Sequence, residues 1–279
     1  MISMNQRQTL FTILSIFAIV QMLGLYCGYQ YLSLIQAGEI EGAFKEPESV
    51  SNSFFLFIYI LLMTGVLLLV IKFKKVLLKV FEAFAIFFAS WIAFDFLIPY
   101  SLIGESVPWG LFLAIALTAW KMLKPTILSQ NIALIFALAG AGSVIGGSLG
   151  VLPVLVFLLI LSIYDFLSVF WTKHMVYLAK AITEKPMAFT AAVPLKTKKV
   201  SHVFQLGGGD LVMPLILSVS VLGRVGLYQA AMTSLGALIA LSILFSYVLK
   251  HPGQALPALP PVSAGACLGL FFGITLFGV

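Results

Sequence analysis

Long apolar runs, separated by short polar segments, extend from residue 9 to the end of the chain. A membrane-spanning helix needs about 20 mostly apolar residues, whereas the strands of a transmembrane barrel show a roughly 10-residue alternating pattern. The runs have the helical length, so the pattern predicts an all-α, polytopic membrane protein with nine transmembrane helices. The predicted spans are approximately residues 9–35, 51–71, 76–99, 107–123, 131–149, 152–172, 203–223, 229–249 and 257–279.

Two of these runs are long enough to hold a pair of spans, and each must therefore fold back once. The first turn is predicted at "GSLGVLP", residues 147–153, where Gly150 and Pro153 interrupt the apolar run. The second is predicted at "GRVGLYQ", residues 223–229.

Composition agrees with a membrane protein, because 61% of the 279 residues are hydrophobic and only 9% are charged. A soluble domain has about a quarter of its residues charged. The net charge of +6 indicates basic cytoplasmic loops here, not a nucleic-acid partner. The partner implied by the composition is the lipid bilayer.

Positive charge predicts the orientation, because cytoplasmic loops carry the excess of lysine and arginine. With a cytoplasmic N-terminus and nine spans, 14 of the 16 Lys and Arg residues fall on the inner side. The outer segments hold only Lys45 and Arg224, and the first outer loop is acidic. We therefore expect a multi-pass protein of the cell membrane with its N-terminus in the cytoplasm and its C-terminus outside.

One cytoplasmic loop is long enough to have structure of its own, at about residues 172–202, with six lysines. Its "KTKK" run either contacts anionic lipid headgroups or is a plain topology signal. A second notable pattern is the four-residue spacing of Gly142, Gly146 and Gly150, which predicts a helix face that another helix approaches closely.

Four ionisable residues lie within predicted spans, where a charge costs at least about 2.5 kcal/mol. Glu82 is expected to pair with Lys79 one turn away near the inner interface. Asp95 lies close to the outer end of its span, before Pro99, and is expected to be structural. The remaining two, Asp165 and Asp210, have no such explanation.

Asp165 and Asp210 are predicted to lie at the same depth. Asp165 is seven residues before the inner end of span six, and Asp210 is seven residues after the inner start of span seven. At 1.5 Å per residue, each is about 10 Å from the cytoplasmic side. No lysine or arginine of either span is close enough to neutralise them, so each is best explained by the other.

Two carboxylates a few ångströms apart in a low dielectric share one proton and titrate as a unit. This arrangement is that of the aspartic proteases, in which one carboxylate activates water and the other protonates the scissile carbonyl. The mechanism needs no cofactor and no metal, and none is expected. The three histidines, His174, His202 and His251, fall in or beside cytoplasmic loops.

The backbone around Asp210 is predicted to be loosened on both sides. Gly207, Gly208 and Gly209 precede it, leaving room for close approach and permitting unusual dihedral angles. Pro214 follows and has no N–H to bond the carbonyl of Asp210. A third break, at Pro257, Ala258 and Leu259, opens the last span on the same side of the membrane.

Together these residues resemble the intramembrane aspartyl proteases of the presenilin and signal peptide peptidase family. The family's motifs are YD, GxGD and PAL, on the sixth, seventh and ninth of nine spans. Here they are Tyr164-Asp165, Gly207-Gly208-Gly209-Asp210 and Pro257-Ala258-Leu259, in the expected order. The match extends from span six to the end of the chain, and no motif supports the first five spans.

The resemblance implies that Asp165 and Asp210 are catalytic and that Tyr164, the three glycines and the Pro257–Leu259 segment shape the site and bind substrate. It implies transmembrane-helix proteins as substrates, cleaved within the membrane. Residues 1–150 would form a scaffold of five helices, and residues 151–279 would carry catalysis. The predicted orientation matches presenilins and suits substrates with a cytoplasmic C-terminus.

The chain departs from presenilins in two respects. Leu211 stands where presenilins usually have an aromatic residue, and the loop after span six lacks the long segment at which they are cut. We therefore do not expect autoproteolysis to be required, and the compact chain resembles a microbial homologue that works without partner subunits. Self-association as a homo-oligomer is left open.

Two other classes of function share some of these features. An ion-coupled secondary transporter also uses broken helices and membrane aspartates, but it commonly shows inverted repeats, and the first half of the chain has no second GGGD-like break. A scaffolding protein would pair its aspartates with lysines of a partner. Cleavage of a single-span substrate that depends on both aspartates distinguishes the protease from both.

Overall fold

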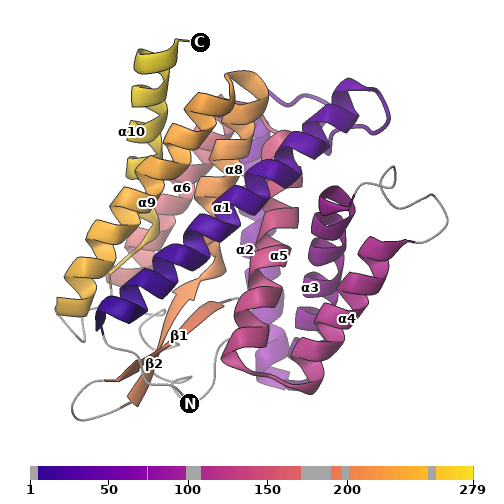
Figure 1. Ribbon diagram of the computed structural model, residues 1–279, viewed down its shortest axis with the longest axis vertical. Coiled ribbons are helices and arrows are strands. Elements are labelled where there is room, and N and C mark those ends of the chain that lie inside the picture. The colour runs from indigo at the N-terminus through magenta and orange to yellow at the C-terminus, as the bar shows by residue number, and fades with distance from the viewer. Residues whose placement is uncertain are drawn as a thin grey trace.

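The computed structural model describes residues 6–73, 75–98, 108–170, 190–196, 201–250 and 256–278. In these ranges the chain forms nine helices and one two-stranded antiparallel sheet, which lies at one end of the helical bundle (Figure 1). Each predicted span overlaps one helix. The helices are α1 (Gln6–Gln36), α2 (Ser51–Phe73), α3 (Lys75–Leu97), α4 (Trp109–Leu123), α5 (Ile127–Gly147), α6 (Val151–Phe170), α8 (Gly208–Arg224), α9 (Leu227–Lys250) and α10 (Leu259–Phe277). The strands are β1 (Thr190–Lys196) and β2 (Ser201–Gly207).

Six helices in the described part of the chain are long and apolar enough to cross a membrane: α1, α3, α5, α6, α9 and α10. Helices α2 and α4 contribute shorter apolar segments, Ser51–Val66 and Trp109–Leu123, and α8 has 17 residues. Large apolar side chains point outward from the bundle, such as Phe11 and Leu123, which are 73% and 81% exposed. Lipid tails accept such a surface, whereas in water it would favour association.

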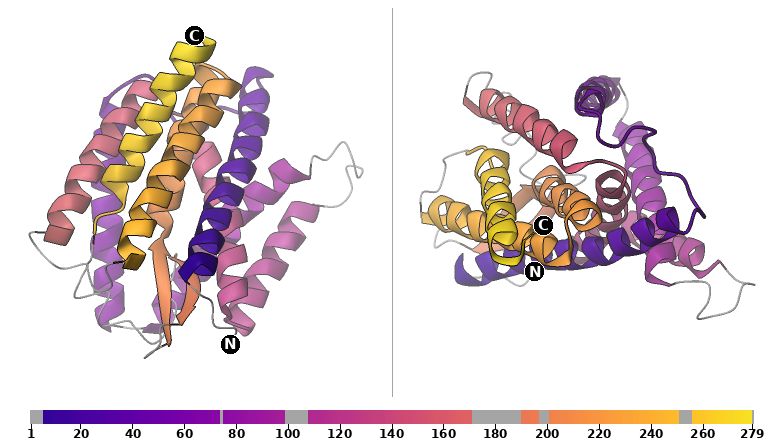
Figure 2. Two further views of the ribbon diagram at one scale, coloured as in Figure 1. Left: turned by 60° about the vertical axis from the view of Figure 1, so that its left-hand side comes forward. Right: turned by 90° about the horizontal axis from the view of Figure 1, so that it is seen from above.

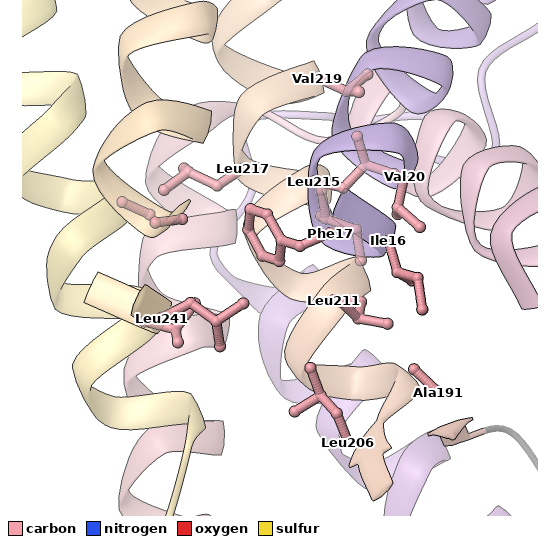
Figure 3. Packing of buried hydrophobic residues seen from close by; sticks show 14 of the residues in the cluster. Ile16, Phe17, Val20, Ala191, Leu206, Leu211, Leu215, Leu217, Val219 and Leu241 are labelled. Carbon is pink, nitrogen blue, oxygen red and sulfur yellow. The ribbon is translucent and has the colours of Figure 1, made fainter. Parts of the chain in front are cut away.

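Helix α8 lies within the bundle and packs against α1, α5, α6, α9 and α10 (Figure 2). Its side chains Leu211 and Leu215 are fully buried and share one apolar cluster with Phe17 and Val20 of α1 (Figure 3). This cluster draws on residues from Ile13 to Leu270, so both halves of the chain contribute to it. The helix that carries Asp210 is therefore held by neighbours on several sides.

Glycines of α5 allow α8 to approach closely. A Cβ atom on Gly142 would lie 2.6 Å from the Cδ2 atom of Leu215, and one on Gly146 would lie 2.6 Å from the carbonyl oxygen of Ile216. The predicted small-residue face is thus confirmed for these two positions. It is wrong for Gly150, which lies beyond the end of α5 and donates its N–H to the carbonyl of Pro47 at 2.8 Å.

Three connections that the lysine distribution assigns to the outer side meet at one end of the bundle. Arg224, at the end of α8, pairs through Nε with Glu48 before α2 at 2.8 Å. The Pro47 to Gly150 hydrogen bond joins the same α1–α2 connection to the α5–α6 turn. Both turns lie where the sequence predicts them, and Gly226 adopts a φ of +150° in the second.

The ion pair predicted within α3 is wrong. Glu82 pairs not with Lys79 but with Lys121 of α4, and both members of this pair are buried. Helix α3 turns the Glu82 side of its surface toward α4, where a second apolar cluster packs, while Lys79 faces outward. Burial of both charges together satisfies each of them away from water.

The sheet is the main departure from the predicted helices. Strands β1 and β2 pair in antiparallel register from Thr190 opposite Gly207 to Lys196 opposite Ser201. Residues 203–207, predicted to start span seven, are therefore strand, and the helix begins at Gly208. Valine and phenylalanine at positions 203 and 204 favour strands, and Gly207, with its low helical propensity, separates them from α8. The rest of the predicted basic loop, residues 172–189 and 197–200, lies outside the described residues.

The hairpin is attached to the bundle through the strand edge that β2 does not use. The side chain of Asn131 on α5 forms two hydrogen bonds with Ala192, donating to its carbonyl at 2.8 Å and accepting from its N–H at 2.9 Å. Gln130 donates to the carbonyl of Thr190 at 3.3 Å. Helix α5 thus positions the hairpin, and β2 leads directly into Gly207 and α8.

Candidate active site

Asp165 lies on α6, five residues before the last described residue of that helix, Phe170. Its carboxylate is partly buried and faces the start of α10. The backbone N–H of Leu259 donates to Oδ2 of Asp165 at 3.2 Å. The Pro257–Leu259 segment therefore contacts Asp165, which agrees with their predicted position on the same side of the membrane.

The local sequence of α10 explains why this N–H is available. The first N–H groups of a helix have no partner within the helix. Pro260 and Pro261 have no N–H, and the N–H of Val262 bonds back to the carbonyl of Ala258 at 3.3 Å. Leu259 is consequently the residue of the first turn that donates outward. A carboxylate at a helix N-terminus also interacts favourably with the helix dipole.

Asp210 lies in the first turn of α8, with Gly207 as the N-cap residue. The carboxylate folds back toward this N-cap, because a Cβ atom on Gly207 would lie 3.2 Å from Oδ2 of Asp210. Asp210 also interacts electrostatically with Asp165 across the α6–α8 contact. The two aspartates, whose pairing the sequence predicts, are thus brought to one place from different helices.

The glycines before Asp210 provide space and not an unusual backbone. Gly207 has a φ of −60°, and neither Gly208 nor Gly209 is among the described glycines with positive φ. The expected unusual dihedral angles are therefore wrong. At Gly207 a side chain would crowd the aspartate, whereas a Cβ on Gly209 would have no atom within 4 Å other than those of its chain neighbours and of the α8 backbone. Gly209, next to Asp210, is therefore exposed and has free space beside it.

Tyr164 points to another part of the bundle. Its ring packs edge-on against Phe57 of α2, with ring centroids 6.0 Å apart, and its side chain is 40% exposed. Phe57 belongs to a small apolar cluster that also includes Leu161 and Leu259. The tyrosine of the predicted YD motif therefore contacts the wall formed by α2, and Asp165 faces α10.

The other two membrane carboxylates lie away from the aspartate pair. Glu82 is paired with Lys121, and Asp95 of α3 lies against the start of α4, where a Cβ on Gly110 would be 3.0 Å from its Cγ atom. Among the described residues, no three His, Cys, Asp or Glu side chains converge as a group of metal ligands. Both carboxylates join α3 to α4, which agrees with their expected structural role.

Two features near the site were not predicted. The β1–β2 hairpin leads into Gly207, and its only signal in the sequence was a pair of short segments around "KTKK". The second is a buried amide, Gln21 of α1, which bonds the backbone of α8 next to Asp210. Gln21 was not predicted because its side chain is uncharged and only ionisable residues within the spans were considered as candidates.

Comparisons with known proteins extend the similarity to nearly all of the chain. A family profile described as signal-peptide peptidase, presenilin aspartyl protease matches residues 14–279. Two solved structures, both described as a presenilin family intramembrane aspartate protease, are similar. One, in space group C222, is 28% identical with a TM-score of 0.73 and covers 96% of this chain and 99% of its own. The other, in space group P2, is 29% identical with a TM-score of 0.71, and the match covers 95% of this chain and 97% of the other chain.

No curated protein matches the chain. The family match includes the first five predicted spans, for which no motif was recognised, and it favours a protease over the transporter and scaffold alternatives. Apolar helices and these relatives together indicate an integral, multi-pass membrane protein. The chain belongs to the signal-peptide peptidase and presenilin aspartyl protease family, and it is an intramembrane aspartic endopeptidase.

Proposed function

We propose that Asp165 and Asp210 are the catalytic pair of this protease and that they hydrolyse peptide bonds within transmembrane helices of substrate proteins. The observation that carries the proposal is that the packed helices α6 and α8 bring Asp165 and Asp210 close enough to interact electrostatically. Glu82, another carboxylate within the helices, is instead paired with Lys121 of α4.

In the proposed reaction the pair holds one proton, since two neighbouring carboxylates in a low dielectric do not both stay ionised. The ionised carboxylate removes a proton from water as the water oxygen attacks the carbonyl carbon. The protonated carboxylate gives its proton to the carbonyl oxygen, which produces a tetrahedral diol. The C–N bond then breaks as the protonated carboxyl gives its proton to the nitrogen and the ionised carboxylate takes a proton from a hydroxyl of the diol, so the pair again holds one proton.

The surrounding residues have supporting roles in this proposal. The N–H of Leu259 fixes the direction of the Asp165 carboxylate, and Pro257 and Ala258 bring that N–H to α6. The glycine segment, Gly207 to Gly209, leaves the backbone beside Asp210 accessible to a substrate whose helix has unwound. Tyr164 contributes to the wall on the α2 side.

We also propose that all nine helices cross the membrane, with the N-terminus in the cytoplasm and the C-terminus outside. The start of α1 and the end of α10 lie at opposite ends of the bundle, as an odd number of crossings requires (Figure 1). The lysine distribution supports the direction. In this arrangement residues 1–150 are the scaffold, and residues 151–279 carry the catalytic pair near the cytoplasmic side.

The test is cleavage of a single-span substrate by the purified protein in proteoliposomes. Asp165→Ala and Asp210→Ala should each abolish cleavage while the protein elutes as a folded species with unchanged helical content. Asp95→Ala is the matched control, since it removes a membrane carboxylate that lies away from the pair. Cleavage by either active-site variant at the wild-type rate would exclude the proposed pair.

A further inference from the structure

Gln21 is a polar side chain in the middle of α1, where it is 3% exposed and surrounded by apolar core residues. Burying an amide without hydrogen-bond partners costs free energy, so a buried glutamine must have them. The partners of Gln21 come from two other helices, α8 and α9. They form a polar connection through an otherwise apolar core.

The amide of Gln21 bonds the backbone of α8 directly after Asp210. Its Nε2 donates to the carbonyl oxygen of Leu211 at 3.0 Å. A backbone carbonyl only accepts, so the amide must present its nitrogen to this atom, and the orientation of the side chain is fixed. Its Oε1 then faces the hydroxyl of Ser234 on α9, at 3.2 Å.

Two serines continue the connection and return it to α8. The Ser234 hydroxyl has one proton, which it donates either to Oε1 of Gln21 or to Oγ of Ser218, 2.8 Å away, and Ser218 donates to the carbonyl oxygen of Pro214 at 2.9 Å. Ser218, Ser234 and Gln21 are all buried. The network thus contacts α8 at two carbonyls, those of Leu211 and Pro214, which lie on either side of one helical turn.

This turn is the one that Pro214 weakens. Proline has no N–H, so the carbonyl of Asp210 lacks the donor that residue 214 would otherwise supply, and the proline ring crowds the same turn. The helix here has fewer internal bonds to hold its shape. An external donor at Leu211, the residue after Asp210, replaces part of that restraint from a neighbouring helix.

We propose that Gln21 is a positioning residue for Asp210: its amide, held between the Leu211 carbonyl and the Ser234 hydroxyl, fixes the turn of α8 from which the aspartate projects. The inference rests on the proposed role of Asp210. It predicts that loss of the amide changes the placement of one carboxylate relative to the other and leaves substrate binding intact. Misplacement of a reacting group by about 1 Å can lower a rate roughly 100-fold.

The test compares three variants of the full-length protein in proteoliposomes. Gln21→Met keeps the length of the side chain and removes the donor, so kcat should fall by about 10- to 100-fold while KM stays unchanged. Gln30→Met is the matched control, because the amide of Gln30 lies on the same helix but bonds only the exposed hydroxyl of Tyr26. That variant should retain the wild-type kcat.

Gln21→Glu supplies a readout that a purely structural residue would not give. A protonated glutamic acid can donate to the Leu211 carbonyl, whereas an ionised one only accepts and repels it. The contacts of this position from α8 and α9 are uncharged, namely the Leu211 carbonyl and Ser234. Activity of Gln21→Glu relative to wild type should therefore fall as pH rises, while that of Gln21→Met should be low at every pH.

The inference is overturned if folded Gln21→Met keeps the wild-type kcat, or if it lowers thermal stability alone. It is also overturned if Gln21→Glu keeps a constant activity relative to wild type across pH. Should Gln21→Met fail to fold, Ser234→Ala replaces it, with a smaller loss of kcat and an unchanged KM expected. Activity of Asp210→Ala would instead refute the proposed catalytic pair, so the two failures are distinguishable.

Discussion

At the scale of single residues, the surroundings of Asp210 differ on its two sides. Gly207 is close enough to the carboxylate that any side chain would press on it, and Gly209 faces open space. Both have ordinary backbone angles, so glycine is used here for volume and not for conformation. The two positions consequently make different predictions for the same substitution.

Gly207→Ala should lower kcat, because the new methyl group would lie 3.2 Å from Oδ2 of Asp210 and displace it by a few tenths of an ångström. Gly209→Ala should instead raise thermal stability, since alanine favours the first turn of α8 by about 0.5–1 kcal/mol over glycine. It should raise KM if substrate occupies the open side. Steady-state kinetics and thermal unfolding of both variants test these predictions. An unchanged kcat in Gly207→Ala would contradict the crowding of Asp210 at that position.

Residue-level reasoning identified the aspartates, because a carboxylate in an apolar run is conspicuous, and it placed Leu259 on the same side. It did not give the partner of Glu82, since Lys121 is distant in the sequence and only the packing of α3 against α4 brings it close. Gln21 was missed for a related reason: an uncharged amide is less conspicuous than a charge, and its partners are on other helices.

At the scale of elements, β2 and α8 are continuous, so the position of the hairpin and that of Asp210 are coupled. Helix α5 contacts both the hairpin and α8. Asn131 bonds β1 of the hairpin, and Gly146 packs against the backbone of α8. The side chain of Asn131 also occupies the hydrogen-bonding groups of Ala192 on the edge of β1 that β2 leaves open. It therefore both positions the hairpin and closes that edge to other strands.

Asn131→Leu should destabilise the protein by about 2 kcal/mol or more, because it leaves the N–H and the carbonyl of Ala192 without their partners. Asn52→Leu is the control, since that amide makes one exposed bond to the carbonyl of Glu46. Thermal unfolding in detergent, with intrinsic fluorescence as the probe, compares the two. Equal midpoints of thermal unfolding for Asn131→Leu and wild type would contradict a stabilising role for the two Asn131–Ala192 hydrogen bonds.

Helices were predictable at this scale and the hairpin was not. A run of about 20 apolar residues leaves few alternatives to a spanning helix, and glycine and proline mark the α5–α6 turn. The last five residues of β2, 203–207, adjoin such a run without a break, so they were assigned to the helix. Strand pairing depends on a partner segment that local periodicity does not reveal.

At the scale of the whole molecule, the contact between Glu48 and Arg224 agrees with the predicted sides. It joins the connections before α2 and after α8, both of which the lysine distribution places outside. Asp210 lies in the first turn of α8, directly after β2, and the hairpin and the start of α1 lie at the opposite end of the bundle (Figure 1). The proposed orientation thus puts the reaction close to the cytoplasmic face.

This orientation can be tested by labelling single cysteines in sealed cells. The background would be Cys27→Ala, Cys267→Ala, which removes both native thiols. A membrane-impermeant maleimide added outside should then label Glu41→Cys, in the first outer connection, and leave Lys124→Cys, after α4, unlabelled until the cells are opened. Labelling in the reverse order would mean that the protein is inserted the other way.

The most direct test of the central claim is the rate of single-turnover cleavage by Asp165→Asn, Asp210→Asn and the double variant, each purified and shown to be folded. Residues that act as one catalytic unit are strongly non-additive. We expect all three variants to share the same background rate, because either substitution alone disables the pair. A single variant that cleaves at the wild-type rate, or two partial losses that multiply in the double variant, would contradict a catalytic pair formed by these aspartates.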